Sequence, residues 1–254
     1  MSFRRYVALG DSFTEGVGNP DPASPNGVRG WADLVAGQLA RDNPAFGYAN
    51  LAIRGRLLRP IIDEQLEGAV AMQPDLVTIY AGGNNLMRPK LDLDALAAEY
   101  DDAIGKLAAT GARVLMWTAY DGSWAPVFGV LRGRWAVYNE LVREIADRHG
   151  ATIVDFWRFT EYRDLRMWDF DRLHMSAAGH HNMAIRVLDL LDVPHTLEPV
   201  RFDEAPLLTR AAQRADDRRW MREFFVPWVA HRVRGISSGD GISPKHPALP
   251  PLGS

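Results

Sequence analysis

Short apolar segments alternate with longer amphipathic segments along the first 190 residues of the chain. The segment at 76–81, Leu-Val-Thr-Ile-Tyr-Ala, is apolar on both faces, which is typical of a strand buried in the middle of a sheet. The next segment has apolar residues at helical spacing, namely Leu93, Leu96, Ala97, Tyr100, Ile104 and Leu107. Strands separated by helices pair in parallel through right-handed crossovers. We therefore expect an α/β fold, a three-layer α/β/α flavodoxin-like sandwich.

The same alternation gives the expected elements. We expect strands at 5–9, 47–53, 76–81, 113–119 and 152–156. We expect helices at 31–40, 57–70, 93–107 and 135–149, and a last helix from the N-cap Ser176 to about Leu191. The predicted core is therefore a five-stranded parallel sheet.

Composition narrows the classes of function. The 254 residues include no cysteine, which excludes disulfides, thiolate metal sites and a cysteine nucleophile. The net charge of −3 offers no basis for binding nucleic acid. The seven histidines lack zinc-like spacing, so we expect no metal and no other cofactor. The first apolar run is too short for a signal sequence and no stretch reaches membrane-spanning length, so we expect a cytoplasmic protein without a transmembrane segment.

A serine follows the first expected strand directly. Gly10-Asp11-Ser12 comes after the apolar run Tyr-Val-Ala-Leu, so the turn can display a hydroxyl at the carboxyl edge of the sheet. Alone, this tripeptide is ordinary turn chemistry. A serine nucleophile also needs a base. Asp171 and His174 supply a base and an acidic partner three residues apart, and together these pieces predict a serine hydrolase.

Two further polar segments follow expected strands, namely 50–55, which ends on Gly55, and 82–85, which contains Asn84. Loops at one edge of a parallel sheet converge in space, so these segments are expected to meet Ser12. With these four blocks in this order, the chain resembles the SGNH hydrolases, also called the GDSL esterase/lipase family, over about its first 190 residues.

The resemblance implies a role for each matching residue. It makes Ser12 the nucleophile, His174 the base and Asp171 the acidic partner of that base. It makes the oxyanion hole from the backbone N–H groups of Ser12 and Gly55 and the side-chain amide of Asn84. Such donors stabilise the negative charge that develops on the carbonyl oxygen, and a glycine allows the backbone to approach the substrate closely.

The chain departs from the family pattern at Asn85, where aspartate is common and gives structural support. Asp11, Arg54, Asn85 and Trp124 are candidates for substrate contact. Arg54 has two interpretations, a solvated side chain with a buried stem or a recognition group for an anion. Trp124 either lines a substrate pocket or packs in the protein.

We divide the chain into a hydrolase domain at 1–194, a helical extension rich in arginine and aromatic residues at 195–235, and a disordered Gly-, Ser- and Pro-rich tail at 236–254. The extension is expected to be helical from Glu204 to about Val233, with a break near Pro227. Four roles remain open for it: a brace on the sandwich, a lid, an arm for a homo-oligomer, or a membrane-surface helix.

We expect a serine hydrolase that cleaves carboxylic esters of small or medium acyl groups through an acyl-enzyme, with a small-molecule ester as its partner. The resemblance also allows a carbohydrate O-deacetylase, a thioesterase or a lysophospholipase. An alternative of another class is a membrane- or partner-docking protein built on the same fold.

Overall fold

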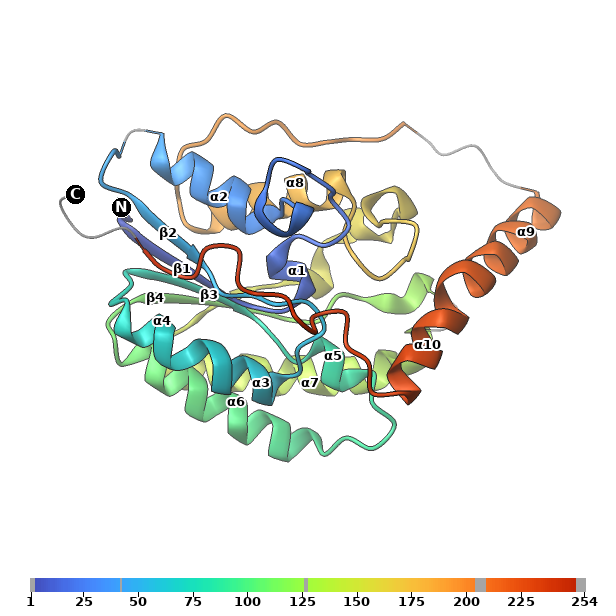
Figure 1. Cartoon of the computed structure of the whole chain (residues 1–254), viewed down its shortest axis with the longest axis horizontal. Coiled ribbons are helices and arrows are strands. Elements are labelled where there is room, and N and C mark those ends of the chain that lie inside the picture. Colours follow the sequence, from blue (N-terminus) through green and yellow to red (C-terminus); the bar gives the residue numbers. More distant parts are fainter. Residues whose placement is uncertain (1–2, 42, 126–127, 204–208, 250–254) are drawn as a thin grey trace.

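The computed structural model describes residues 3–41, 43–125, 128–203 and 209–249. Five parallel strands form one sheet in the order β2-β1-β3-β4-β5 (Figure 1). The strands are β1 (Arg5–Gly10), β2 (Gly47–Asn50), β3 (Leu76–Tyr80), β4 (Arg113–Trp117) and β5 (Thr152–Val154). This order is that of flavodoxin-like folds, so the predicted α/β sandwich and its five-stranded parallel sheet are confirmed.

Helices cover both faces of the sheet (Figure 1). On one face lie α2 (Trp31–Ala40) and α8 (Ala177–Leu190). On the other lie α3 (Leu58–Ile61), α4 (Glu67–Ala71), α6 (Leu93–Ala108) and α7 (Arg132–His149). A π-helical turn, Ile62–Leu66, joins α3 to α4, so the helix expected at 57–70 is one helix with a wider turn inside it.

Helix α6 illustrates how the sequence pattern builds these layers. Its N-cap Asp92 accepts a hydrogen bond of 2.9 Å from the backbone N–H of Ala95, which satisfies one of the free donors of the first turn. Its buried residues are Leu96, Tyr100, Ala103, Ile104 and Leu107. They recur every three or four residues and therefore form one apolar face toward the core.

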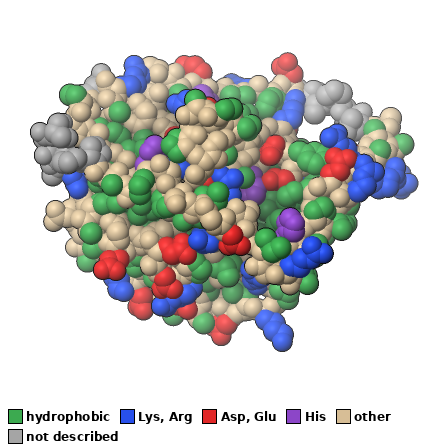
Figure 2. All heavy atoms as spheres, in the orientation of Figure 1, with side chains coloured by type: hydrophobic (Ala, Val, Ile, Leu, Met, Phe, Trp, Pro, Cys, Tyr) green, Lys and Arg blue, Asp and Glu red, His purple; other side chains and the backbone are tan. Residues whose placement is uncertain are grey.

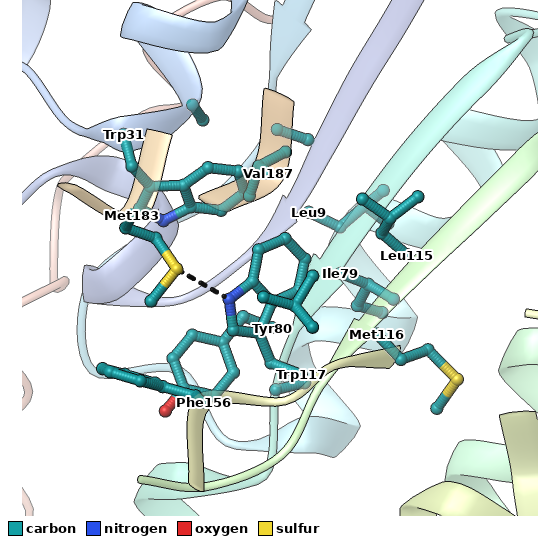
Figure 3. Close-up of a cluster of buried hydrophobic side chains, with 14 of the residues drawn as sticks. Leu9, Trp31, Ile79, Tyr80, Leu115, Met116, Trp117, Phe156, Met183 and Val187 are labelled. Atoms are coloured by element: carbon teal, nitrogen blue, oxygen red, sulfur yellow. Dashed lines mark hydrogen bonds between the residues drawn. The ribbon is translucent and has the colours of Figure 1, made fainter. Parts of the chain in front are cut away.

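Large aromatic side chains fill the core between the sheet and α2 with α8 (Figure 3). The rings of Trp31 and Trp117 lie 4.6 Å apart, and both side chains are fully buried. The indole N–H of Trp117 points at the sulfur of Met183 at 3.4 Å, so this polar group is not left unpaired in the core. The contact ties β4 to α8.

The chain reverses its direction of winding between β1 and β3. Strand β1 pairs with both β2 and β3, so the loops that follow β1 and β3 depart from neighbouring strands. Gly10 ends β1 with a φ of +142°, and a Cβ there would meet the carbonyl oxygen of Tyr80 at 2.5 Å. Glycine is therefore required at this position. Ligands of open α/β sheets bind in the crevice at such a switch point.

The helical extension stands as an arm at one side of the sandwich (Figure 1). It consists of α9 (Arg210–Trp220), a π-helical turn (Met221–Phe225) and α10 (Val226–Val233), while 204–208 lie outside the described residues. The break expected near Pro227 does not occur. The wider turn just before Pro227 accommodates a residue that has no N–H and a bulky ring, so the helix continues. We name residues 210–233 the arm.

The arm packs on the sandwich through aromatic side chains. The ring of Phe128 lies 6.3 Å from that of Trp220, 6.4 Å from that of Phe225 and 6.3 Å from that of Trp228, all edge to face. Trp220 and Phe128 are both buried. Aromatic burial of this kind stabilises a helix that would be marginal on its own in water.

The segment after the arm returns across the molecule to the edge strand β2 (Figure 1). The expected disorder at 236–254 does not hold for residues 236–249, and 250–254 lie outside the described residues. The ammonium of Lys245 is buried and donates to Asp33 Oδ2 at 2.6 Å and to the carbonyl oxygens of Val28 and Glu15 at 2.7 and 3.1 Å. Three acceptors satisfy the cation, so a Gly- and Pro-rich composition does not prevent a fixed position.

Candidate active site

Ser12 lies where the buried strand β1 ends, in the first turn of the short helix α1 (Ser12–Glu15). Its Oγ is 2.9 Å from Nε2 of His174. Nδ1 of the same imidazole is 2.6 Å from Oδ2 of Asp171. A carboxylate accepts only, so Nδ1 carries the ring proton and Nε2 is free to accept from the serine hydroxyl. The structure thus brings these three predicted residues together in one hydrogen-bonded chain.

The loop before α8 fixes the positions of Asp171 and His174. Oδ1 of Asp171 accepts the backbone N–H groups of Leu173 and His174, both at 2.8 Å. Arg172 between them adopts a left-handed conformation with a φ of +54°. The carboxylate therefore orders its own loop with one oxygen and the imidazole with the other.

The arm holds this loop from outside. The guanidinium of Arg172 pairs with the carboxylates of Asp216 and Asp217 on α9. The same guanidinium stacks on the ring of Trp220 at 5.2 Å, and the indole N–H of Trp220 donates to the backbone oxygen of Asp171 at 2.8 Å. These contacts join segments that are far apart in the chain, so no local sequence pattern predicts them.

The charges of the imidazole and the carboxylate support each other. Burial disfavours the charged form of His174, but the charge and hydrogen bond of Asp171, together with the charges of Asp11 and Asp169, raise the pKa of the imidazole above its ordinary value of 6.5. Burial likewise opposes ionisation of Asp171, but the charge and hydrogen bond of His174 lower its pKa. Asp171 is therefore ionised, and His174 is a stronger base than a free histidine.

Gly55 lines the same cleft as Ser12 and His174. It has a φ of +77°, and a Cβ there would meet Oγ of Ser237 at 2.6 Å. Ser237, in the segment after the arm, therefore packs directly on the predicted oxyanion glycine. Within the described ranges, the backbone N–H groups of Ser12 and Gly55 donate to no other residue. Both donors are available for a ligand.

Asn84 lies in the short helix α5 (Gly83–Leu86), which follows β3 at the carboxyl edge of the sheet. Its amide nitrogen donates to Oδ2 of Asp11 at 2.9 Å and to the carbonyl oxygen of Arg56 at 3.1 Å, and its amide oxygen accepts from Arg232 at 3.1 Å. Both amide hydrogens are thus engaged. Asn84 can donate to a substrate oxygen only if one of these bonds is exchanged.

Asp11 is a buried carboxylate beside the reacting groups. Its Oδ1 accepts from the backbone N–H of Phe13 at 3.2 Å, and its Oδ2 accepts from Asn84. Burial raises the pKa of Asp11 to about 6, while these two hydrogen bonds and the nearby His174 oppose the rise. Its contacts orient Asn84.

The other three predicted substrate contacts are engaged within the protein. Asn85 Oδ1 accepts the backbone N–H of Leu58 at 2.9 Å, so it joins the loop after β3 to the start of α3. The guanidinium of Arg54 pairs with the buried carboxylate of Glu15, with Nε at 3.0 Å from both oxygens. Trp124 packs on the rings of Tyr120 and Trp168 at 6.3 and 5.2 Å.

Two cavities flank Ser12. A small pocket of about 30 Å³ beside the serine and His174 has a mostly apolar and aromatic lining, to which Asp11 and Asn84 add polar groups. Its lining includes Phe13, Tyr80, Leu86, Met87, Tyr120 and Trp135. A larger cleft of about 460 Å³ lies between the sandwich, the arm and the segment after it. Figure 2 shows charged and histidine side chains on this face, where the arm stands beside the body of the molecule.

Residues that sequence reasoning missed line these cavities. Tyr120 and Trp135 line the small pocket, and Arg88 and Arg232 line the cleft. The arginine-rich composition of the extension was a signal, but it did not indicate which arginine reaches the cleft. His180 is buried on α8: it accepts the backbone N–H of Trp31 at 3.2 Å, and burial lowers its pKa to about 4.

The family model described as GDSL-like lipase/acylhydrolase matches residues 8–181. The chain belongs to this family. It is therefore an SGNH-type ester hydrolase, and the predicted resemblance is confirmed. The match ends before the arm, so neither the arm nor the segment after it lies within the matched region.

Solved structures share the fold. An α/β hydrolase, LAE5, from the metagenome of Lake Arreo is 23% identical, with a TM-score of 0.61, over 76% of this chain and 97% of that one. The acetylxylan esterase Axe2 from Geobacillus stearothermophilus is 21% identical, with a TM-score of 0.60, over 76% of this chain and 98% of that one. The esterase EstA from Pseudoalteromonas is 17% identical, with a TM-score of 0.54, over 74% and 96%. No curated protein gives a significant match.

The described residues contain no group of three or more His, Asp or Glu side chains that could hold a metal ion. Among their helices, none combines the length and the apolar character needed to span a membrane.

Proposed function

We propose that the protein hydrolyses carboxylic esters with short acyl groups through an acyl-enzyme on Ser12. The observation that carries the proposal is the hydrogen-bonded chain from Ser12 through His174 to Asp171, with distances of 2.9 and 2.6 Å. A serine hydroxyl is a weak nucleophile until a base accepts its proton. Nε2 of His174 carries no proton and can accept this one, and Asp171 orients the imidazole for the transfer.

In the first half of the reaction, Oγ of Ser12 bonds to the ester carbonyl carbon, and its proton moves to Nε2 of His174. The resulting imidazolium is stabilised by the carboxylate of Asp171. It then gives the proton to the leaving alcohol oxygen as the bond between that oxygen and the carbonyl carbon breaks. The acyl group remains on Ser12.

In the second half, water attacks the acyl carbon, and His174 takes a proton from it. The imidazolium returns this proton to Oγ of Ser12 as the acyl-enzyme bond breaks, which releases the carboxylic acid. The serine and the neutral imidazole are thereby restored, so the cycle needs no other reactant.

The developing negative charge on the carbonyl oxygen needs donors. The free backbone N–H groups of Ser12 and Gly55 are suited to this role. Asn84 adds a third donor if its amide exchanges the bond to Arg56 or Asp11 for one to the substrate. Each such donor is worth roughly 3 kcal/mol of the barrier.

The sizes of the two cavities favour a short acyl group. The apolar pocket of about 30 Å³ holds roughly two water-sized groups, which suits an acetyl or propionyl chain. The cleft of about 460 Å³ then takes the alcohol. A long lysophospholipid acyl chain exceeds the small pocket. A carbohydrate O-deacetylase fits these sizes, and the similar structures include two different proteins described as acetylxylan esterases.

The test is a series of p-nitrophenyl esters from acetate to octanoate, together with labelling by a fluorophosphonate. We expect the highest kcat/KM with acetate or propionate and covalent labelling at Ser12. Ser12→Ala should lose both turnover and labelling while the far-ultraviolet circular dichroism stays unchanged. Ser176→Ala is a matched control, because Ser176 caps α8 outside both cavities. Turnover by Ser12→Ala near the wild-type rate would overturn the mechanism.

A further inference from the structure

Two arginines from different parts of the chain line the cleft beside Ser12 with donors unused. Arg88 follows α5, and Arg232 lies on α10. Both line the same cleft as Ser12 and His174. Two guanidinium-bearing side chains therefore line the cleft next to the serine, and neither lines the small pocket.

Arg232 is held firmly in this position. Its guanidinium stacks over the ring of Trp228 at 4.2 Å and donates to the amide oxygen of Asn84 at 3.1 Å. Its second terminal nitrogen, Nη1, is buried and has no hydrogen-bond partner among the described residues. Nε of Arg88 is buried without a described partner in the same way. Both arginines of the cleft therefore keep a donor that an anionic ligand can satisfy.

The charges around the cleft are not balanced by the protein. Three arginines line it, but Arg54 is neutralised by the buried carboxylate of Glu15. Asp171 is the one carboxylate among the described lining residues, and it is bonded to His174. In the described part of the chain, neither Arg88 nor Arg232 forms an ion pair.

The two free cations also act on each other. Burial and the positive charge of Arg88 lower the pKa of Arg232 to about 10, with Asp11 opposing. Arg232 is still charged at neutral pH, so two like charges remain partly buried together. An anion between them would offset this repulsion and supply the missing acceptors.

We propose that the natural substrate is an ester whose alcohol carries a carboxylate or a phosphate, and that Arg88 and Arg232 bind this anion. The inference rests on the proposed function, because attack by Ser12 with the acyl group in the apolar pocket leaves the alcohol in the cleft. Planar guanidinium groups with several donors suit carboxylate and phosphate oxygens. Both arginines would then determine specificity for the leaving group.

The test uses three acetate esters that share the acyl group and the aromatic ring. They are 4-acetoxybenzoate, 4-acetoxyphenyl phosphate and the neutral 4-acetoxybenzamide, each rate being divided by its spontaneous hydrolysis. We expect kcat/KM to favour one or both anions over the amide by about tenfold to a hundredfold, as for charge-assisted hydrogen bonds. The better of the two anions identifies the headgroup. Added NaCl should reduce the preference.

Variants of the two arginines test whether they cause the preference for anionic esters. Arg88→Met and Arg232→Met should each lower the ratio of anionic to neutral kcat/KM, and the double variant should remove the preference. Arg59→Met is the matched control, since Arg59 is exposed, pairs with Asp63 and does not line the cleft. It should keep the wild-type ratio. If a variant fails to fold, inhibition of the wild type by benzoate and by inorganic phosphate replaces it, with competition against the neutral ester expected.

The outcomes separate the two proposals. Equal use of all three esters with normal labelling of Ser12, or no competition by either anion, would overturn the anion site and leave the esterase mechanism intact. An unchanged ratio in the double variant would overturn the assignment to these arginines. Failure of all three esters together with absent serine labelling would overturn the proposed function itself.

Discussion

The indole N–H of Trp220 donates to the backbone oxygen of Asp171 at 2.8 Å, which joins the C-terminal arm to the loop that carries His174. The arm therefore bears on the geometry of the reacting groups without contributing a reacting group. This relationship makes residues outside the matched family region part of the catalytic frame.

Trp220→Phe should remove this hydrogen bond while keeping an aromatic ring against Phe128. We expect kcat to fall several-fold, because a net hydrogen bond is worth about 1 kcal/mol and the freed loop holds Asp171 less firmly. Trp157→Phe is the control, since Trp157 belongs to neither the arm nor the cleft lining. Steady-state kinetics on an acetate ester would measure both. Equal kcat in Trp220→Phe and wild type would contradict the role of this contact.

Activity should fall on acidification through the pKa of His174. The base must be neutral, and Asp171 raises the pKa of the imidazole, so the acid limb of kcat/KM should lie above the ordinary value of 6.5. Asp171→Asn removes the charge that raises this pKa, so it should shift the limb to lower pH and lower the plateau. An acid limb below 6.5 in the wild type would contradict the pairing.

Asp11 should make the protein less stable as pH rises from about 4 to about 6. Its folded pKa of about 6 exceeds the ordinary value of 3.8, so the folded state binds more protons in that window. The contribution to stability is full below 3.8 and is lost as pH rises through 6, by on the order of 3 kcal/mol. Urea unfolding of wild type and Asp11→Asn across this range should show their difference changing by that amount. A constant difference would refute the buried ionisation.

Substitutions of the neighbouring residues Asn84 and Asn85 should affect different properties, the first catalysis and the second stability. Asn84→Ala removes the proposed third oxyanion donor, so we expect kcat to fall by roughly 100-fold with little change in KM. Asn85→Ala removes the acceptor for the N–H of Leu58 and should lower the melting temperature with a smaller effect on kcat. A loss confined to KM in Asn84→Ala would mean that the amide binds the ground state only.

Lys245→Met should destabilise the fold by about 3 kcal/mol, because it leaves the carboxylate of Asp33 without its buried cation. Lys90→Met is the matched control, since Lys90 is exposed. Deleting residues 236–254 should cost at least as much and should also lower kcat, since Ser237 packs on Gly55. Thermal unfolding and kinetics on the two variants and the shortened chain measure these effects. A shortened chain with wild-type stability would show that this packing is incidental.

Local patterns in the sequence were sufficient for the sheet and for the meeting of Ser12 with His174. Buried strands have a recognisable composition, and the carboxyl ends of parallel strands converge wherever the helices lie. The contact of Arg232 with Asn84 could not be predicted in this way. It joins residues 148 positions apart, and it depends on the direction of an arm that local composition does not specify.

The prediction of a disordered tail was wrong for residues 236–249 for a related reason. Its glycine, serine and proline content predicts disorder, yet the position of one lysine among three buried acceptors decides the outcome. The composition of a segment does not reveal the buried contacts that one of its residues makes. The engagement of both amide hydrogens of Asn84 was equally hidden, because a motif shows which donor is present and not which acceptors surround it.

The return of the chain to β2 has a consequence for association between molecules. β2 is an outer strand of the sheet, and the backbone of Asn50 there exchanges hydrogen bonds with His246 in an antiparallel bridge. An open outer strand is a template on which another polypeptide can add a strand. His246 occupies this template at the carboxyl end of β2, shortly before the loop that carries Gly55. Proteolytic loss of residues 236–254 would therefore expose the unpaired edge of β2 and uncover Gly55 at the same time. A single cut would then both lower activity and allow strand pairing between molecules.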